Sequence, residues 1–464
     1  MNRSLKFIEK LVYVLKVKQN NNSYHIKVKD MPRLAFVMVK KYGLKGFAYK
    51  FNNYLNNVVH NNKIPFNMEI KPGDVSTVGQ LLNCKFKNLQ PINFVKISRD
   101  EFRLNIVTDS IKKQSLFGGV ATSLILATLF SNKYKIPLRI ITRETENNPD
   151  DYEKFLDFMQ ITKPNKVEFF SDYDRNDGKN NFKLETSDKD IFLSTSWWST
   201  EAIKSVNLRK KSFYILQEVE KFFYPNGDDQ YLCENILHDQ NINFIVNSKL
   251  LFDFYSLNNY KNIISQGICF EPAFPEHIYL PGLNTFSKKT KYKMLFYARP
   301  NNPRNLFYTG IKIIDEAIRV GIINLDEWEI YFAGSNIPDL VFSDGMKPIM
   351  LGHMDWQEYS KFLKEVDLGF CLMYTPHPSY PPLDISSSGG VVLTNSYLNK
   401  QSLKYSKNII CVNLDEESML DGFEKAICLV KDVSTRKNNY NDNCIERNWS
   451  NSFETILDYM NKNK

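Results

Sequence analysis

The sequence predicts an α/β protein with two successive parallel-sheet domains, preceded by a basic, α-rich arm. Three observations carry this prediction. Short apolar runs alternate with helix-length segments from about residue 104, the alternation stops at Pro272–Lys293 and then restarts, and positive charge is concentrated in the first fifty residues. Alternating strands and helices are typical of parallel sheets covered by helices on both faces.

The first alternating unit contains six short apolar runs that we interpret as buried strands, and helical segments such as Ala121–Phe130 and Asp151–Gln160 lie between them. The strands are expected at Leu104–Val107, Leu138–Ile141, Val167–Phe170, Ile191–Ser194, Phe213–Leu216 and Asn243–Val246.

The second unit repeats the pattern after the Pro272–Lys293 connection, and the chain ends in a helix with Trp449, Phe453, Ile456 and Met460 on one face. Strands are expected at Lys293–Tyr297, Glu329–Phe332, Leu368–Met373 and Val391–Thr394, and helices at Leu306–Val320 and Trp356–Val366. We therefore expect an arm over residues 1–95, domains over 100–285 and 290–445, and a terminal helix over 446–464 that returns to the first domain.

Composition excludes several classes of protein. Aromatic residues make up 14% of the 464 residues, which excludes a disordered or fibrous chain. The seven cysteines show no CxxC and no paired spacing, which argues against a disulfide framework or a zinc site and for a reducing compartment. The longest nearly apolar run, Gly118–Phe130, is shorter than the roughly 20 residues of a spanning helix, and no secretory signal is recognisable. We expect a soluble, cytoplasmic protein.

The basic arm is the strongest charge feature. Residues 1–50 hold twelve Lys and Arg against two acids, a net charge of +10, so the rest of the chain carries −2 of the +8 total. Apolar residues recur at helical spacing beside these lysines, as at Leu5, Ile8, Val12 and Leu15. The pattern favours attachment of residues 1–55 to an anionic membrane surface. A helical face packed on the body is the alternative, and no basic, aromatic-interleaved stripe continues into the body to indicate nucleic acid.

Candidate ligand-binding residues of the first unit follow its strands. Gly118 and Gly119 open a helix, where glycine lets a ligand approach the backbone and unpaired N–H groups suit an anion, although an ordinary turn is the alternative. Trp197 and Trp198 follow a strand beside serine and threonine hydroxyls, a combination that suits a sugar. Core packing would explain one tryptophan more easily than two. Gln217 and Glu218 end the next strand, and Tyr224 follows them.

The second unit offers two arginines and a proline-rich loop. Arg299 and Arg304 come just after a strand, and the planar fork of arginine suits a phosphate or diphosphate, with a surface salt bridge as the alternative for either one. The loop carries His377, Ser379, Tyr380 and Asp384. Its prolines predict a helix start whose N–H groups and dipole point outward.

Metal chemistry has little support in the sequence. The six histidines have no ligand spacing, and HExxH and GxSxG are absent. The segment Asp172–Tyr173–Asp174 mimics a metal-binding DxD, but it lies in a polar loop that we interpret as a solvated turn.

The stretches Ala298–Asn305 and Thr375–Gly390 carry a resemblance over roughly residues 100–460. They resemble GT-B glycosyltransferases of family 4 and, more closely, the rhamnosyltransferases of bacterial S-layer and related surface glycans. Trp197–Trp198 and Gln217–Glu218 fit the same group. The resemblance implies two facing Rossmann-like domains with a central cleft, and a retaining transfer from a nucleotide sugar that needs no metal and no cofactor, with dTDP-L-rhamnose as the donor.

The resemblance also implies roles for single residues. Arg299 matches the arginine that binds the donor phosphate, Arg304 replaces the family's lysine, and Gly352 matches a glycine near the base. Asp384 stands at the second glutamate of the family's Glu-x7-Glu motif, which binds the ribose, whereas Pro376 occupies the place of the first. The catalytic set is then Glu218, Arg299, Arg304 and Asp384. The donor-binding set adds Gly118, Gly119, Gly352, His377, Ser379 and Tyr380, and the acceptor-binding set is Trp197, Trp198, Gln217, Glu218 and Tyr224.

We therefore expect a glycosyltransferase that acts on a glycan or lipid-linked acceptor at the inner face of the membrane. The alternatives are a catalytically degenerate protein that binds a glycan or nucleotide sugar, which the missing glutamate encourages, and a nucleotide-sugar epimerase or phosphorylase on the same fold.

Overall fold

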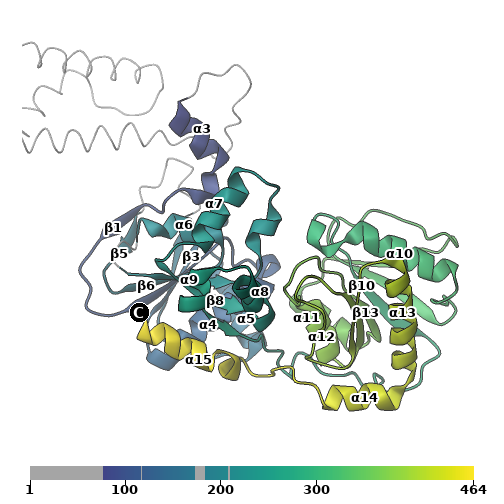
Figure 1. The fold of residues 1–464 in the computed structure, drawn as a ribbon. Coiled ribbons are helices and arrows are strands. Elements are labelled where there is room, and N and C mark those ends of the chain that lie inside the picture. Colours follow the sequence, from purple (N-terminus) through teal and green to yellow (C-terminus); the bar gives the residue numbers. More distant parts are fainter. Residues whose placement is uncertain (1–76, 117, 173–182, 207–209) are drawn as a thin grey trace, which may run out of the picture. The chain divides into compact units, whose positions relative to one another are not determined.

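The computed structural model describes residues 77–464, except 117, 173–182 and 207–209 (Figure 1). The predicted membrane segment, residues 1–55, lies outside the described residues. Helix α3 (Val78–Lys85) belongs to the first of two units, and residues 86–464 form the second. Everything below concerns the second unit, which contains two parallel sheets.

The first sheet has seven parallel strands in the order β4-β3-β2-β6-β7-β8-β9. Its six predicted strands are confirmed, each within one residue at either end, because runs buried on both faces are continuously apolar. Its strands are β2 (Arg103–Thr108), β3 (Leu138–Thr142), β4 (Val167–Ser171), β6 (Asp190–Ser194), β7 (Ser212–Leu216), β8 (Ile242–Asn247) and β9 (Ile268–Phe270).

The helices of this domain follow the strands, and a two-stranded parallel sheet, β1 (Phe94–Lys96) with β5 (Leu184–Thr186), was not predicted. Its short strands carry too few apolar residues to stand out. The helices are α4 (Gly118–Tyr134), α5 (Pro149–Met159), α6 (Trp197–Lys204), α7 (Asp228–Leu237), α8 (Lys249–Leu257) and α9 (Lys261–Gln266), with short η2 (Lys87–Leu89), η3 (Lys113–Ser115) and η5 (Glu220–Phe223).

The second sheet has six parallel strands in the order β12-β11-β10-β13-β14-β15. The predicted strand at 368–373 ends at Phe370, because Met373 N–H donates to the Asn395 side chain instead of a neighbouring strand. Its strands are β10 (Tyr292–Tyr297), β11 (Trp328–Ala333), β12 (Ile349–Gly352), β13 (Leu368–Phe370), β14 (Val391–Asn395) and β15 (Ile409–Val412). Its helices are η6 (Pro303–Asn305), α10 (Phe307–Arg319), α11 (Trp356–Leu363), α12 (Pro381–Ser387), α13 (Glu416–Lys431) and α14 (Val433–Asn441).

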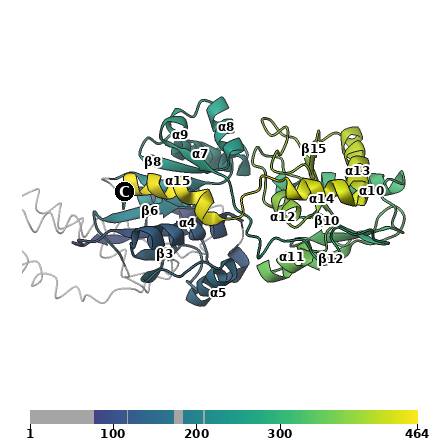
Figure 2. The same ribbon diagram turned by 90° about the horizontal axis from the view of Figure 1, so that it is seen from below.

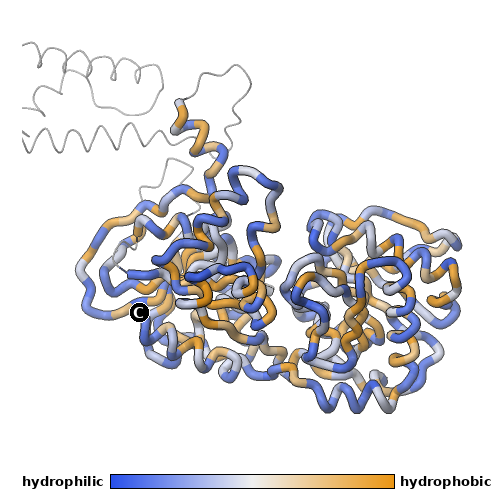
Figure 3. Tube along the Cα trace, in the orientation of Figure 1, coloured by the Kyte–Doolittle hydropathy of each residue, from blue (hydrophilic) through white to orange (hydrophobic). Residues whose placement is uncertain are grey.

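The last helix, α15 (Trp449–Lys462), packs against α4 and β9 (Figure 2). Trp449, Phe453, Ile456 and Met460 lie in the core cluster of the first sheet, beside Leu104. The chain thus crosses from the second sheet back to the first domain. Apolar residues follow the strands inside each domain, as Figure 3 shows.

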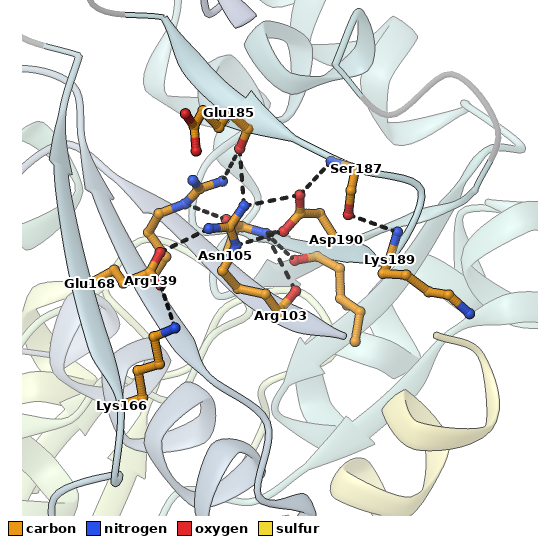
Figure 4. A network of polar contacts seen from close by, with 10 residues as sticks. Arg103, Asn105, Arg139, Lys166, Glu168, Glu185, Ser187, Lys189 and Asp190 are labelled. Atoms are coloured by element: carbon orange, nitrogen blue, oxygen red, sulfur yellow. Dashed lines mark hydrogen bonds and ion pairs between the residues drawn. The ribbon is translucent and has the colours of Figure 1, made fainter. Parts of the chain in front are cut away.

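A buried polar network holds the amino ends of the first sheet together (Figure 4). Arg103, at the start of β2, donates to both Asp190 oxygens at 2.8 and 3.2 Å and to Glu168 at 2.8 Å. Arg139 reaches the same network through Asn105 at 2.7 Å, and both arginines donate to the Glu185 carbonyl of β5. Two cations and two carboxylates therefore balance, and they tie the small sheet to the large one.

We expect Asp190→Asn to lower the free energy of unfolding by about 3–5 kcal/mol, because it leaves buried Arg103 short of one charge partner. Asp188→Asn is the matched control, because Asp188 pairs with Lys96 at 3.5 Å on the surface and such pairs contribute about 0–1 kcal/mol. Urea denaturation of both variants is the measurement. Equal stability of the two would contradict the role assigned to the network.

Candidate active site

The carboxyl ends of β7 and β10 meet at one ion pair. Arg304, in η6 after β10, donates from Nη1 to Glu218 Oε2 at 2.8 Å, and Thr375 Oγ1, after β13, donates to the same oxygen at 3.2 Å. The other oxygen of Glu218 accepts from Val219 N–H at 2.9 Å. Ligands of open parallel sheets bind at these strand ends, so the ion pair marks a site built from both sheets.

Arg304 and Glu218 are both largely covered. The Arg304 guanidinium lies 4.1 Å from the centre of the Phe223 ring, and burial lowers the Arg304 pKa although Glu218 opposes this. Burial likewise raises the pKa of Glu218, against the effect of Arg304. Arg299, by contrast, is exposed and donates to Tyr297 Oη at 3.3 Å. The structure therefore brings Glu218 and Arg304 together and leaves Arg299 open to a ligand.

Tyr380 joins the proline-rich loop to the first domain. Its hydroxyl receives a hydrogen bond from Asn247 Nδ2 at 2.6 Å and shares another with Thr122 Oγ1 at 2.7 Å. A Cβ on Gly118 would lie 3.5 Å from the Tyr380 ring, and one on Gly119 would lie 2.9 Å from Gln217 Nε2. Gln217 donates to the Gly119 carbonyl at 2.7 Å. The space beside the glycine pair is thus taken by Tyr380 and Gln217, side chains of the protein itself.

The tryptophan pair corrects one prediction. Trp197 is 2% exposed, belongs to a core cluster and donates from Nε1 to Tyr224 Oη at 2.9 Å, so its ring faces are covered. Trp198 is half-buried and donates to Asp109 at 2.9 and 3.0 Å. The two rings differ because α6 begins at Trp197, and neighbouring residues of a helix point about 100° apart. Core packing therefore accounts for Trp197, and Trp198 keeps a partly open ring.

The predicted outward N–H groups of the helix start are also a correction. Pro381 and Pro382 open α12 and have no N–H, while Leu383 and Asp384 both donate their N–H to the Tyr380 carbonyl at 2.8 Å. Backbone donors at this helix start are therefore absent or already used. An anion at this edge depends on side chains.

Asp384 lies in an apolar, tyrosine-lined environment. It is buried, and Tyr359 Oη donates to its Oδ2 at 3.4 Å. Burial raises the pKa of Asp384 to about 7, although hydrogen bonds from Tyr279 and Tyr359 oppose the shift. Gly352 ends the edge strand β12 with a φ of +66° and is exposed at the same carboxyl edge.

His377 and Ser379 pair with each other. Ser379, with a φ of +67°, donates its N–H to His377 Nδ1 at 3.0 Å. Both residues are 6% exposed.

Sequence reasoning missed Lys400 and Asn247 at this site. Lys400 follows β14, is fully buried and donates to the Met373 carbonyl at 2.8 Å. Its position after a predicted strand was a usable signal, but lysine is almost never fully buried, so its burial was not foreseeable. Asn247 ends β8, and a strand-end position alone indicates no partner.

No metal centre was found in the described part of the chain, where no three His, Cys, Asp or Glu side chains gather suitably. Asp172 is buried and lies 3.4 Å from Arg143, whereas Tyr173 and Asp174 lie outside the described residues. None of the described helices is long and apolar enough to cross a membrane.

A groove of about 700 Å³ opens elsewhere, at the amino ends of β3 and β4. Its lining includes Lys135, Gln160, Lys166 and Trp449 and none of the predicted site residues. The chemistry argued here lies at the opposite, carboxyl edge of the sheet.

Comparison with known proteins agrees with the two-domain geometry. Residues 103–249 match the family model described as WsaF, N-terminal domain, and residues 292–424 match WsaF, C-terminal domain. The chain carries both WsaF domains. Each matched range falls on one of the two sheets, so the Glu218–Arg304 pair joins the two WsaF domains.

Solved structures establish the GT-B fold. The Anabaena Alr3699/HepE structure in complex with UDP has a TM-score of 0.53 at 10% identity, over 78% of this chain and 100% of that one. S. aureus TarM, in complex with fondaparinux, α-GlcNAc-glycerol and UDP, gives 0.55 at 10% identity, over 78% and 100%. Both WsaF domains therefore have the Rossmann-like architecture of GT-B glycosyltransferases.

A curated relative is the O-antigen biosynthesis protein RfbC of Myxococcus xanthus, 24% identical over 253 residues. The match covers 51% of this chain and 18% of the relative, so the WsaF-type chain spans about a fifth of that protein.

We expect the stability of the protein to fall between about pH 4 and pH 7 through Asp384. The folded state keeps a proton up to about pH 7, whereas the unfolded carboxyl releases it near 3.9, so the folded state binds more protons in this window. Asp384→Asn should therefore reduce the loss of unfolding free energy between pH 5 and pH 8, measured with urea. Asp421→Asn, at an exposed position, is the control. An unchanged pH dependence in Asp384→Asn would contradict the assignment.

Proposed function

We propose that the protein is a glycosyltransferase that moves a sugar from a nucleotide-sugar donor to a glycan or lipid-linked glycan acceptor. The observation that carries the proposal is the meeting of the two sheet edges at Glu218, Arg304 and Thr375. A site built from two Rossmann-like domains can hold a nucleotide on one sheet and an acceptor on the other.

The donor would lie on the second sheet. Arg299 is exposed and Arg304 engages only Nε and Nη1 in hydrogen bonds with described residues, so both guanidinium groups have donors for a diphosphate. The titles of the HepE and TarM structures name UDP, which supports a nucleotide donor. Within that class we propose dTDP-L-rhamnose, on the resemblance of Ala298–Asn305 and Thr375–Gly390.

The chemistry breaks the bond between the sugar C1 and the diphosphate oxygen. Negative charge then develops on the leaving diphosphate, and Arg299 and Arg304 would stabilise it without a metal ion. We propose retention of configuration, for which no protein base is required. Asp384 would bind the ribose.

The acceptor would approach the first sheet. Trp198 keeps an open part of its ring there, and Glu218 ends the neighbouring strand. O-antigen biosynthesis, named for the Myxococcus relative, supports a surface glycan as the acceptor.

A nucleotide-sugar panel tests the proposal. Purified protein is incubated with dTDP-L-rhamnose, UDP-glucose and UDP-GlcNAc, with and without acceptor glycan and EDTA. We expect acceptor-linked sugar that is unaffected by EDTA. Sugar-nucleotide binding without turnover would favour a degenerate binding protein, which Pro376 in place of the first glutamate would explain, and nucleotide release without linked sugar would favour a phosphorylase or epimerase.

We expect Arg299→Ala and Arg304→Gln each to lower kcat/KM about 10- to 150-fold, the value of one hydrogen bond to a charged group. Steady-state kinetics is the measurement, and Arg319→Ala is the control, because Arg319 pairs with Glu316 on the surface of α10. Arg304→Gln leaves Glu218 unpaired, so the double variant Glu218→Gln/Arg304→Gln separates folding from binding. Normal kinetics in both arginine variants would remove the diphosphate assignment.

We also propose that residues 1–55 attach the protein to the inner, anionic membrane surface. Lys16→Gln/Lys18→Gln should weaken binding to phosphatidylserine vesicles about 30-fold, since each lysine contributes about 1 kcal/mol. The control is Lys404→Gln/Lys407→Gln, which removes two exposed charges of the second domain. Vesicle flotation at low and high salt measures the effect, and equal loss in both double variants would show that the arm is not the anchor.

A further inference from the structure

The donor loop leaves one side-chain donor unused at its centre. His377 Nδ1 accepts a hydrogen bond from Ser379 N–H at 3.0 Å, so the ring proton of the neutral imidazole is assigned to Nε2. His377 is 6% exposed, and Nε2 has no hydrogen-bond partner among the described residues. A buried N–H without an acceptor is unfavourable, and in a binding loop it indicates that a ligand supplies the acceptor.

The surroundings of His377 are positively charged. Arg304 and Lys400 both act on its charge, and together with burial they lower the His377 pKa to about 3. The ring is therefore neutral at physiological pH and can donate a hydrogen bond without acting as an acid.

Lys400 contributes a buried charge that its neighbours do not neutralise by contact. It is fully buried, its Nζ donates to the Met373 carbonyl at 2.8 Å, and the ion pairs of the described residues do not include it. Glu218 is the carboxylate that acts on it, and Glu218 also serves Arg304. Two cations thus share one carboxylate, and burying such an excess is costly unless an anion completes the site.

The backbone does not supply the remaining donors. The start of α12 has two prolines, and the next two N–H groups bond the Tyr380 carbonyl. A ligand oxygen at this loop therefore depends on side-chain donors, and His377 provides one.

We propose that this pocket binds the sugar-proximal phosphate of the donor, with His377 Nε2–H donating to a phosphate oxygen and Lys400 supplying balancing charge from behind the loop. The inference rests on the proposed function and deepens it. His377 is then a binding residue and Lys400 a positioning residue. Because Nε2 is covered, the phosphate reaches it when groups that join the domains, such as Glu218 and Thr375, move apart.

Isothermal titration with dTDP, dTMP, UDP and UMP tests the role of His377. His377→Asn keeps an acceptor for Ser379 N–H and loses the outer donor, whereas His377→Gln restores a donor near the Nε2 position. We expect His377→Asn to bind the diphosphate about 10- to 100-fold more weakly and the monophosphate unchanged, with partial recovery in His377→Gln. His238→Asn, at a partly exposed histidine of the first domain, is the control.

The outcomes separate this inference from the proposed function. If wild-type protein binds neither diphosphate, the nucleotide-sugar function fails. If it binds one of them and His377→Asn, folded by thermal melting, binds it equally well, the phosphate contact alone is overturned. Equal weakening for monophosphate and diphosphate would also overturn it, because it would place His377 away from the sugar-proximal phosphate.

Lys400 has its own test. Lys400→Gln keeps a donor for the Met373 carbonyl and removes the charge, whereas Lys400→Arg keeps the charge. We expect diphosphate affinity to fall about 10-fold in the first variant and to be preserved within about 3-fold in the second. A similar loss in both variants would show that Lys400 acts through packing, which contradicts the assigned charge role.

Discussion

The Glu218–Arg304 ion pair is the contact on which the geometry of the site depends. It joins the carboxyl ends of β7 and β10, and Thr375 brings the proline-rich loop to the same carboxylate oxygen. Burying this pair costs desolvation energy that its attraction only partly returns, so it is a weak source of stability. Its effect is positional, because it fixes the Arg304 guanidinium at the edge where a diphosphate would lie.

A second contact gives the loop its register against the first domain. Tyr380 reaches Thr122 and Asn247 across the domains, and the glycine pair leaves room for its ring and for Gln217. The same residue accepts the first N–H groups of α12 on its carbonyl. Tyr380 thus couples the start of the donor helix to the acceptor domain, so domain opening and loop conformation are linked through one side chain.

Much of the fold could be predicted from the sequence because strands buried on both faces are continuous apolar runs, as at Phe213–Leu216. The edge strands β12 and β15 were missed because they are short, and the residues of β12 are mostly exposed. The strand-end rule located Glu218 and Arg304 correctly at one edge. It could not show that they pair, because pairing depends on how two domains meet.

Other site residues could not be foreseen for identifiable physical reasons. Trp197 points into the core because a helix starts there, and the tandem pattern alone does not fix the direction of either ring. The prolines of α12 signalled a helix start correctly, but they also removed the N–H groups that the interpretation needed. Lys400 was overlooked because burial of a lysine depends on tertiary context.

A crystal structure of the protein with dTDP or UDP is the most direct test of the central claim. The account predicts a diphosphate at the carboxyl edge of the second sheet, with phosphate oxygens within hydrogen-bond distance of Arg304 and His377 and with Asp384 on the ribose side. A nucleotide bound instead in the groove near Trp449, or at the strand edge without contact to Arg304, would contradict it.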